Sequence, residues 1–114
     1  MNVISLKGTN LELTEAIKNY IDKKLVGLEK LVKDFEPVAE ILVEVGKSTH
    51  HHKKGPYMRC EYTLHVPNEV LRVEEQREDL YEAIDLATDE LKRRVKSFKD
   101  RLQDKNRGPR PGKE

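Results

Sequence analysis

The residues whose types and spacing best fit a chemical task are the lysines and arginines near the C-terminus. Residues 92–113 hold ten Lys and Arg against two acids, a local balance of +8, whereas residues 61–90 hold ten acids against two arginines, a balance of −8. The formal net charge of +1 hides this segregation. Acids early and bases late suit the macrodipole of a helix, but that effect fades within the last turn. The surplus of bases predicts a polyanionic ligand whose phosphates they neutralise.

Histidine and cysteine are the other candidates for chemistry. His50, His51 and His52 are adjacent in a polar stretch, and adjacent residues of a flexible loop cannot preorganise a tetrahedral metal site. His65 and Cys60 fall on opposite sides of one expected strand, with Cys60 on the apolar side. We therefore expect an exposed polar loop, a core cysteine, no metal and no cofactor. The sequence shows no Ser-His-Asp or Cys-His arrangement and no evident carboxylate pair of the kind that would point to an enzyme.

Length and composition predict one soluble domain. The chain has 114 residues, 38% of them charged, and one cysteine, which cannot form an intramolecular disulfide. A lone cysteine favours a reducing compartment. No charged-then-apolar leader and no apolar run near the ~18 residues of a membrane span is present. We expect a cytoplasmic protein with no membrane contact.

Apolar periodicity predicts the elements that position these side chains. Leu13, Ile17, Ile21, Leu25 and Leu28 recur at helical spacing, with Thr14 as a candidate N-cap. The expected elements are a strand over 2–7 that Gly8 breaks, a helix over 11–32, strands over 39–45, 58–66 and 71–73, and a helix from 78 to about 102. This order predicts an α+β fold, β-α-β-β-β-α. In it, a four-stranded sheet carries two helices packed on one face, the first two strands are parallel and the later ones antiparallel.

We expect residues 1–104 to form this domain and residues 105–114 to form a disordered basic tail, because the tail has neither apolar period nor apolar content. On a helical wheel, the outward arc of the second helix carries Lys92, Arg93, Lys96 and Lys99. The flanks of its apolar stripe carry two arginines, and Lys24 lies near the edge of the stripe on the first helix. The candidate RNA-binding residues are Lys23, Lys24, Lys30, Lys92, Arg93, Arg94, Lys96, Lys99 and Arg101.

If the helices lie side by side, residues that flank the stripes line the groove between them. We expect Lys24 with Arg94 or Arg101 to hold phosphates in that groove. A solvated charged face is the alternative, because Asp89–Arg93 and Glu90–Arg94 are spaced as i,i+4 pairs.

Other bases lack such partners, which favours nucleic acid. Aromatic residues make up 5% of the chain and Trp is absent, so base stacking is not the expected mode. Helix-borne bases that contact phosphates and read shape fit a structured RNA better.

The chain resembles the short ribosome hibernation promoting factors and ribosome-associated inhibitors. Three stretches carry the resemblance: ISLKGTNLELTEAIKNYIDKKLVGLEKL, EYTLHV with its PNEVL turn, and EDLYEAIDLATDELKRRVKSFKDRL. It covers residues 1 to about 102 and implies a fold similar to double-stranded-RNA-binding domains. It implies binding to small-subunit rRNA in the decoding region, in the channel for mRNA and the A- and P-site tRNAs. It further implies no chemical reaction, inhibited initiation and the protection of idle ribosomes in stationary phase or stress.

Family basic positions match here at Lys24 and Arg93, whereas Gly27, Glu90 and Ser97 stand where the family commonly has bases. The chain ends well before the ribosome-dimerising domain of the long members, so we expect a monomer that does not pair ribosomes by itself. Some short members favour ribosome dimers together with a small ribosome-dimerising companion factor, and others oppose dimers. The alternative function is a non-ribosomal protein-binding module or a generic structured-RNA-binding module.

Overall fold

The computed structural model describes residues 1–35, 39–48 and 57–107, with side chains described as far as Gln103. In chain order the elements are β1 (Asn2–Thr9), α1 (Glu15–Val32), a 3-10 turn (Lys33–Phe35), β2 (Glu40–Lys47), β3 (Met58–Val66), β4 (Glu69–Arg77) and α2 (Leu80–Arg107). This order confirms the predicted β-α-β-β-β-α arrangement. The loop with His50–His52 lies outside the described residues, so its expected exposure stays a prediction.

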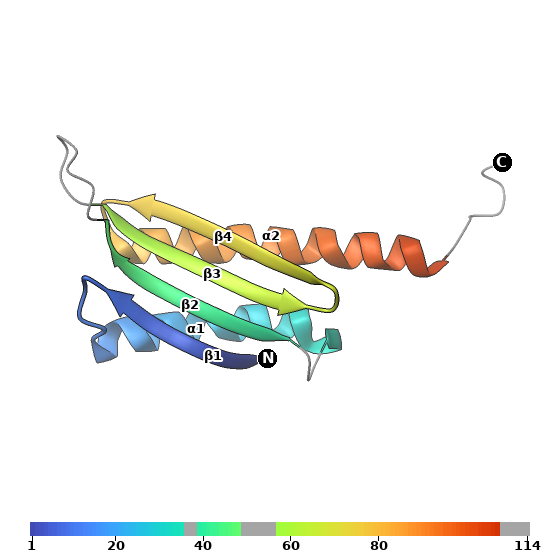
Figure 1. Cartoon of the computed structure of the whole chain (residues 1–114), viewed down its shortest axis with the longest axis horizontal. Helices are drawn as coiled ribbons and strands as arrows, with labels where there is room; N and C mark the ends of the chain where they lie inside the picture. Colours follow the sequence, from blue (N-terminus) through green and yellow to red (C-terminus); the bar gives the residue numbers. More distant parts are fainter. Residues whose placement is uncertain (36–38, 49–56, 108–114) are drawn as a thin grey trace.

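The four strands form one sheet in the order β1-β2-β3-β4 (Figure 1). β1 pairs with β2 in parallel, as expected for a strand-helix-strand unit, and the other two pairs are antiparallel. β3 and β4 are joined by the tight turn at Pro67 and Asn68, where Asn68 has a φ of 64°. Asparagine tolerates this left-handed conformation better than most residues, which explains its place in the turn.

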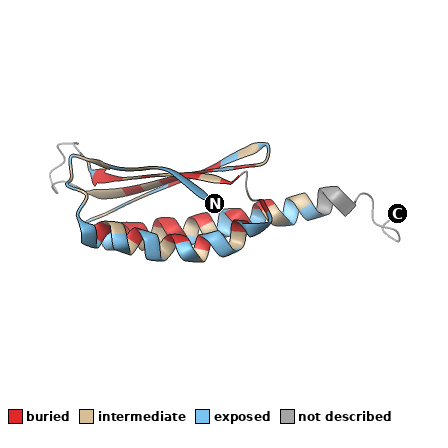
Figure 2. Cartoon of the chain, turned by 90° about the horizontal axis from the view of Figure 1, so that it is seen from below, coloured by how far each residue is buried: buried red, intermediate tan, exposed pale blue. Residues whose placement is uncertain are grey.

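Both helices cover the same face of the sheet (Figure 2). Their apolar stripes turn toward the strands and meet the alternate strand residues that include Val43, Tyr62 and Leu64. Tyr62 and Thr88 bring the polar atoms of this core together, because their hydroxyl oxygens lie 2.9 Å apart and Thr88 also donates to the Ile84 carbonyl at 2.7 Å. The predicted two-layer architecture is therefore confirmed, with the other face of the sheet left open.

Polar side chains set the starts of both helices. The Thr14 hydroxyl accepts a hydrogen bond from the Ile17 amide at 3.2 Å, which confirms the predicted N-cap. At the start of α2, a carboxylate oxygen of Asp79 accepts one from the Tyr81 amide at 3.2 Å. None of the described helices combines the length and the apolarity that crossing a bilayer requires.

Several element boundaries differ from the sequence prediction, among them the start of α1, which is Glu15 and not residue 11. β1 continues through Gly8 to Thr9, because Gly8 pairs with Val45 of β2. A Cβ on Gly8 would stand 2.7 Å from the Leu11 carbonyl oxygen, so the glycine permits the tight return of the chain and does not break the strand. β4 spans Glu69–Arg77 and is longer than the predicted strand over 71–73, and α2 runs on to Arg107. The predicted tail beyond Arg107 lies outside the described residues.

Candidate nucleic-acid interface

α1 and α2 lie side by side and run in the same direction (Figure 1). Contacts between them follow the same order along both helices, which sets the register of the groove. Listed from the N-terminal end, the contacting residues are Tyr20 with Tyr81, Lys24 with Asp85, Gly27 with Lys92 and Leu31 with Lys99.

Lys24 is held by an acid on the other helix. Its Nζ lies 2.9 Å from Oδ1 of Asp85, and the Tyr20 hydroxyl donates to the same oxygen at 2.5 Å. Desolvation raises the pKa of Asp85, but the hydrogen bonds from Tyr20 and Lys24 outweigh it and leave that pKa below its usual value. The hydrogen bond to Asp85 also raises the pKa of Lys24. Lys24 is therefore a cation whose charge is largely offset within the protein.

Two lysines of α2 reach across the groove toward α1, although the helical wheel placed them on the outward arc. Lys92 passes over Gly27, where its Nζ is 3.1 Å from the point that a Cβ on residue 27 would occupy. Lys99 donates to the Leu31 carbonyl at 3.1 Å and lies 3.7 Å from a carboxylate oxygen of Asp34. Lys99 thus satisfies a carbonyl in the last turn of α1 that has no partner within the helix.

Arg94 and Arg101 lie on the opposite flank of α2, beside β4. Nη1 of Arg94 is 3.4 Å from the Arg72 carbonyl oxygen, and Nη2 of Arg101 is 3.1 Å from a carboxylate oxygen of Glu69. The expectation that one of them joins Lys24 in the groove is therefore wrong. A helix has two flanks beside its apolar stripe, and only the other flank of α2 faces α1.

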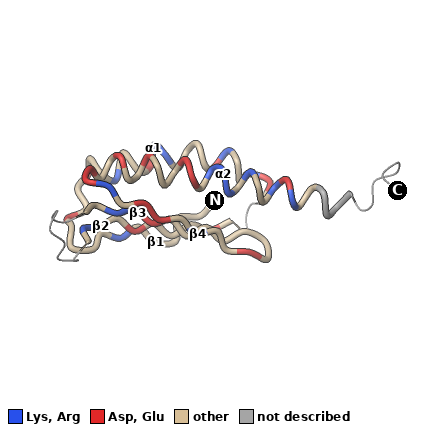
Figure 3. Tube along the Cα trace, turned by 90° about the horizontal axis from the view of Figure 1, so that it is seen from above, with Lys and Arg blue, Asp and Glu red and all other residues tan. Residues whose placement is uncertain are grey.

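Arg93 points outward, and its guanidinium pairs with Glu90 on the preceding turn. The pairing is i,i+3, in place of the i,i+4 pairs expected from Asp89 and Glu90. The exposed lysines Lys23, Lys30 and Lys96, with the half-buried Lys92, form no ion pair with any carboxylate in the described part of the chain. Figure 3 shows Lys and Arg along both helices. Arg94 and Lys33 form no ion pair with a described carboxylate either, so the uncompensated positive charge of the helix layer comes from these four lysines together with Arg94 and Lys33.

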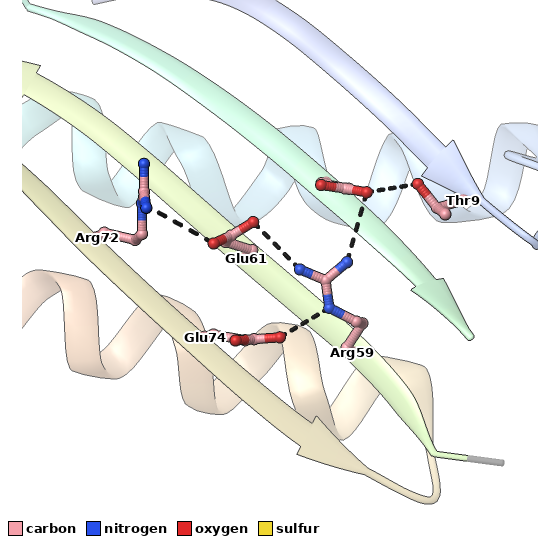
Figure 4. A network of polar contacts seen from close by, with 6 residues as sticks. Thr9, Arg59, Glu61, Arg72 and Glu74 are labelled. Atoms are coloured by element: carbon pink, nitrogen blue, oxygen red, sulfur yellow. Dashed lines mark hydrogen bonds and ion pairs between the residues drawn. The ribbon is translucent and has the colours of Figure 1, made fainter. Parts of the chain in front are cut away.

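The two arginines on the open face of the sheet, Arg59 and Arg72, are paired with acids (Figure 4). Arg59 of β3 lies 3.4 Å from Glu44 of β2, 3.1 Å from Glu61 and 2.8 Å from Glu74 of β4. Arg72 lies 3.9 Å from Glu61. The three glutamates stand directly opposite one another in the strand register. Both arginines of the open face therefore have acids beside them, whereas four lysines of the helix layer have none among the described carboxylates.

Among the residues that the structure describes, the other candidates for chemistry form no reactive centre. Cys60 is fully buried, and desolvation raises its pKa to about 12, so its thiol stays protonated. The described residues contain no group of three His, Cys, Asp or Glu that could hold a metal ion.

A family model described as Sigma 54 modulation protein / S30EA ribosomal protein matches residues 4–103. The chain belongs to this family. Its S30EA relatives include the ribosome hibernation promotion factor of Deinococcus radiodurans, 32% identical over 111 residues that make up 97% of this chain and 56% of the relative. The factor of the same name from Staphylococcus aureus (strain COL) is 35% identical over 102 residues, 90% of this chain and 50% of the relative. The chain thus spans about half the length of the curated relatives it matches.

Solved structures agree with the S30EA fold. The N-terminal domain of Thermus thermophilus Protein Y is 38% identical with a TM-score of 0.65, over 86% of this chain and 99% of that one. A ribosomal subunit interface protein from Coxiella burnetii is 14% identical with a TM-score of 0.67, over 88% of this chain and 99% of that one, and supports the fold alone. The suspected family and the fold are both confirmed.

Sequence reasoning missed Asp85 as the partner of Lys24 and Gly27 as the seat of Lys92. A signal was present, because Asp85, Lys92 and Lys99 are seven residues apart and must therefore share one face of a helix. The Arg59 cluster had no comparable signal. It depends on the register of three strands, two of which are joined through residues outside the described part of the chain.

Proposed function

We propose that this protein binds small-subunit rRNA in the decoding region, in the channel for mRNA and the A- and P-site tRNAs. Bound there, it prevents initiation and keeps idle ribosomes in a hibernating state. It does so as a cytoplasmic, non-enzymatic monomer. The family and its ribosome hibernation relatives support the link to the ribosome.

One observation carries the mode of binding. Lys23, Lys30, Lys92 and Lys96 present charges from two adjacent helices that no described carboxylate offsets, whereas the arginines of the open sheet face are paired. Phosphates gain more from an ammonium that has no internal partner, because no existing ion pair has to be broken. The helix layer is therefore the RNA-binding side, and the sheet faces away from the RNA.

Contacts of this kind recognise the backbone and shape of folded RNA. Lysine ammonium groups on helices reach phosphates without reading base edges. Tyr20 and Tyr81 pack edge to face against each other, with ring centroids 4.8 Å apart, and are not stacking platforms for bases. The protein thus selects its rRNA site by the folded shape of the RNA and not by its base sequence.

The direct test is co-sedimentation of the protein with purified small subunits over a range of salt concentrations. Binding should weaken steeply as salt rises, because counterions are released from the neutralised phosphates. Lys30→Glu with Lys96→Glu, one change on each helix, should weaken binding about tenfold or more at fixed salt. Footprinting on the rRNA should then place the protected nucleotides in the decoding region.

The matched control is Lys7→Glu with Arg72→Glu, which makes the same change in net charge on the open face of the sheet. Binding of this variant should stay within about threefold of the unchanged protein, once circular dichroism shows that both are folded. Equal losses in both variants would mean that net charge alone matters. No binding of the unchanged protein at low salt would rule out the proposal, and binding to a partner that survives nuclease digestion would favour a protein-binding module.

A further inference from the structure

On the surface of α1, two exposed lysines flank a glycine, which has no side chain. Lys23, Gly27 and Lys30 are four and three residues apart, so they are neighbours on the helix surface. Lys23 and Lys30 are exposed, and Gly27 between them offers no side chain. A glycine inside a helix lowers its stability by about 1 kcal/mol relative to alanine, so a compensating contact is expected at this position.

α2 fills this gap with Lys92. The Nζ and Cε atoms of Lys92 lie 3.1 and 3.3 Å from the point where a Cβ on residue 27 would stand. A Cβ at position 27 would force the end of the Lys92 side chain to shift by a few tenths of an ångström. The bare backbone of Gly27 therefore seats the end of the Lys92 side chain.

The ammonium group of Lys92 is not neutralised by any carboxylate in the described part of the protein. Lys24 and Lys99, its neighbours along the same groove, pair with Asp85 and Asp34. Lys92 forms no ion pair with any described carboxylate, and its half-buried stem is supported by the groove. A lysine whose stem is packed loses less conformational freedom when its head group binds a ligand.

We propose that Lys92, seated on Gly27 between Lys23 and Lys30, forms a phosphate-binding site shared by the two helices, with a phosphodiester of the RNA backbone as its ligand. This inference rests on the proposed function. In it, Gly27 is a positioning residue that lets α2 supply the charge missing from α1. The site also spans the contact between the helices, so one phosphate can touch both.

A charge-relocation experiment tests this site. Lys92→Ala should weaken binding to small subunits about three- to tenfold. It should also lower the slope of log affinity against log salt by about one, as expected for one lost phosphate contact. The double variant Gly27→Lys with Lys92→Ala returns an ammonium to the same part of the surface, now carried by α1. It should restore the affinity to within about twofold.

The matched control is His65→Lys with Lys92→Ala, which restores the total charge on the open face of the sheet and should remain as weak as Lys92→Ala alone. Rescue by this control, or unchanged binding of Lys92→Ala while the unchanged protein binds, would overturn the shared site and leave the proposed function standing. Failure of the unchanged protein to bind small subunits would overturn both. A fall in affinity without recovery in Gly27→Lys with Lys92→Ala would also contradict the site.

Discussion

At the scale of single residues, Asp85 sets how much of the charge on Lys24 a ligand can use. Its carboxylate accepts from both Lys24 and Tyr20, and it joins the N-terminal half of α2 to α1. The resemblance matched Lys24 to a family basic position, but the ion pair means that a phosphate must compete with Asp85 for it. Asp85 therefore stabilises the contact between the helices but reduces the positive charge that Lys24 presents at the surface.

The variant Asp85→Asn should show both effects, a lower stability and a tighter binding of small subunits. Above the ordinary titration range of a carboxyl group, near pH 4, the variant should unfold at a lower urea concentration because it loses the ion pair. The folded pKa of Asp85 is depressed, so its contribution to stability is lost as pH falls through that pKa. The two urea midpoints should therefore converge below about pH 4. At neutral pH the variant should bind small subunits more tightly, because Lys24 is released.

Asp22→Asn is the control, since Asp22 is an exposed carboxylate on α1. It should leave the urea midpoint nearly unchanged at every pH. A constant difference between Asp85→Asn and the unchanged protein from pH 7 to 3 would show that the ion pair does not contribute as described.

At the scale of elements, the open face of the sheet is stabilised by one arginine. Arg59 is one-fifth exposed and lies within 3.4 Å of glutamates on β2, β3 and β4. The hydrogen bond to Glu74 raises its pKa further. The hydrogen bond from Thr9 lowers the pKa of Glu44, and Arg59 adds to that effect. Without Arg59, three carboxylates would face one another across neighbouring strands, an arrangement that destabilises a sheet.

Arg59→Met keeps much of the stem but removes the charge, and should lower the free energy of unfolding by about 1 to 3 kcal/mol at neutral pH. The Thr9 hydrogen bond and Arg59 lower the folded pKa of Glu44, so the part of the loss that involves Glu44 should shrink as pH falls through that pKa. Urea unfolding at pH 7 and pH 4 measures both effects. Arg72→Met, at a side chain that is two-thirds exposed, is the control and should cost much less. Equal costs for the two variants would contradict the bridging role of Arg59.

The elements themselves were predictable because each has one apolar face. The alternation from Met58 to Val66 and the helical stripe through Ile84, Leu91 and Phe98 report burial directly, and the structure buries all of the stripe residues. The arrangement of charges was only half predictable. A helical wheel measures angles about one axis, so it placed Lys92 on the outward arc and Arg94 beside the apolar stripe but could not tell which flank faces α1. The contact between Lys92 and Gly27 could not be predicted without knowing how α2 lies beside α1.

At the scale of the whole molecule, charge is divided between the N- and C-terminal halves of α2 and between the two faces. α2 also runs beyond the end of the sheet, past the turn that joins β3 and β4 (Figure 1). The sequence from 104 onward adds four bases, Lys105, Arg107, Arg110 and Lys113, against two acids, Asp104 and Glu114. The positively charged part of the chain is therefore longer than the part that packs on the sheet.

A variant that ends at Gln103 should separate binding from folding. Its free energy of unfolding should stay within about 0.5 kcal/mol of the unchanged protein, because the last core residue, Phe98, is retained. Its affinity for small subunits should fall severalfold at low salt, and the two affinities should converge as salt rises. Co-sedimentation over the salt series measures this. Equal affinities at every salt concentration would mean that residues 104–114 take no part in binding.

Cys60 sits in the interior of the sheet, on the face that the helices cover, and it carries the only sulfhydryl of the chain. An alkylating reagent reaches that sulfur only after the core between the sheet and the helices opens, so the labelling rate reports the fraction of molecules that are open at any moment. The protein thus carries its own reporter of stability, readable without denaturant. A ligand that binds the closed form alone slows the labelling by the factor 1 + [L]/Kd, so this thiol can measure binding at a surface it never touches.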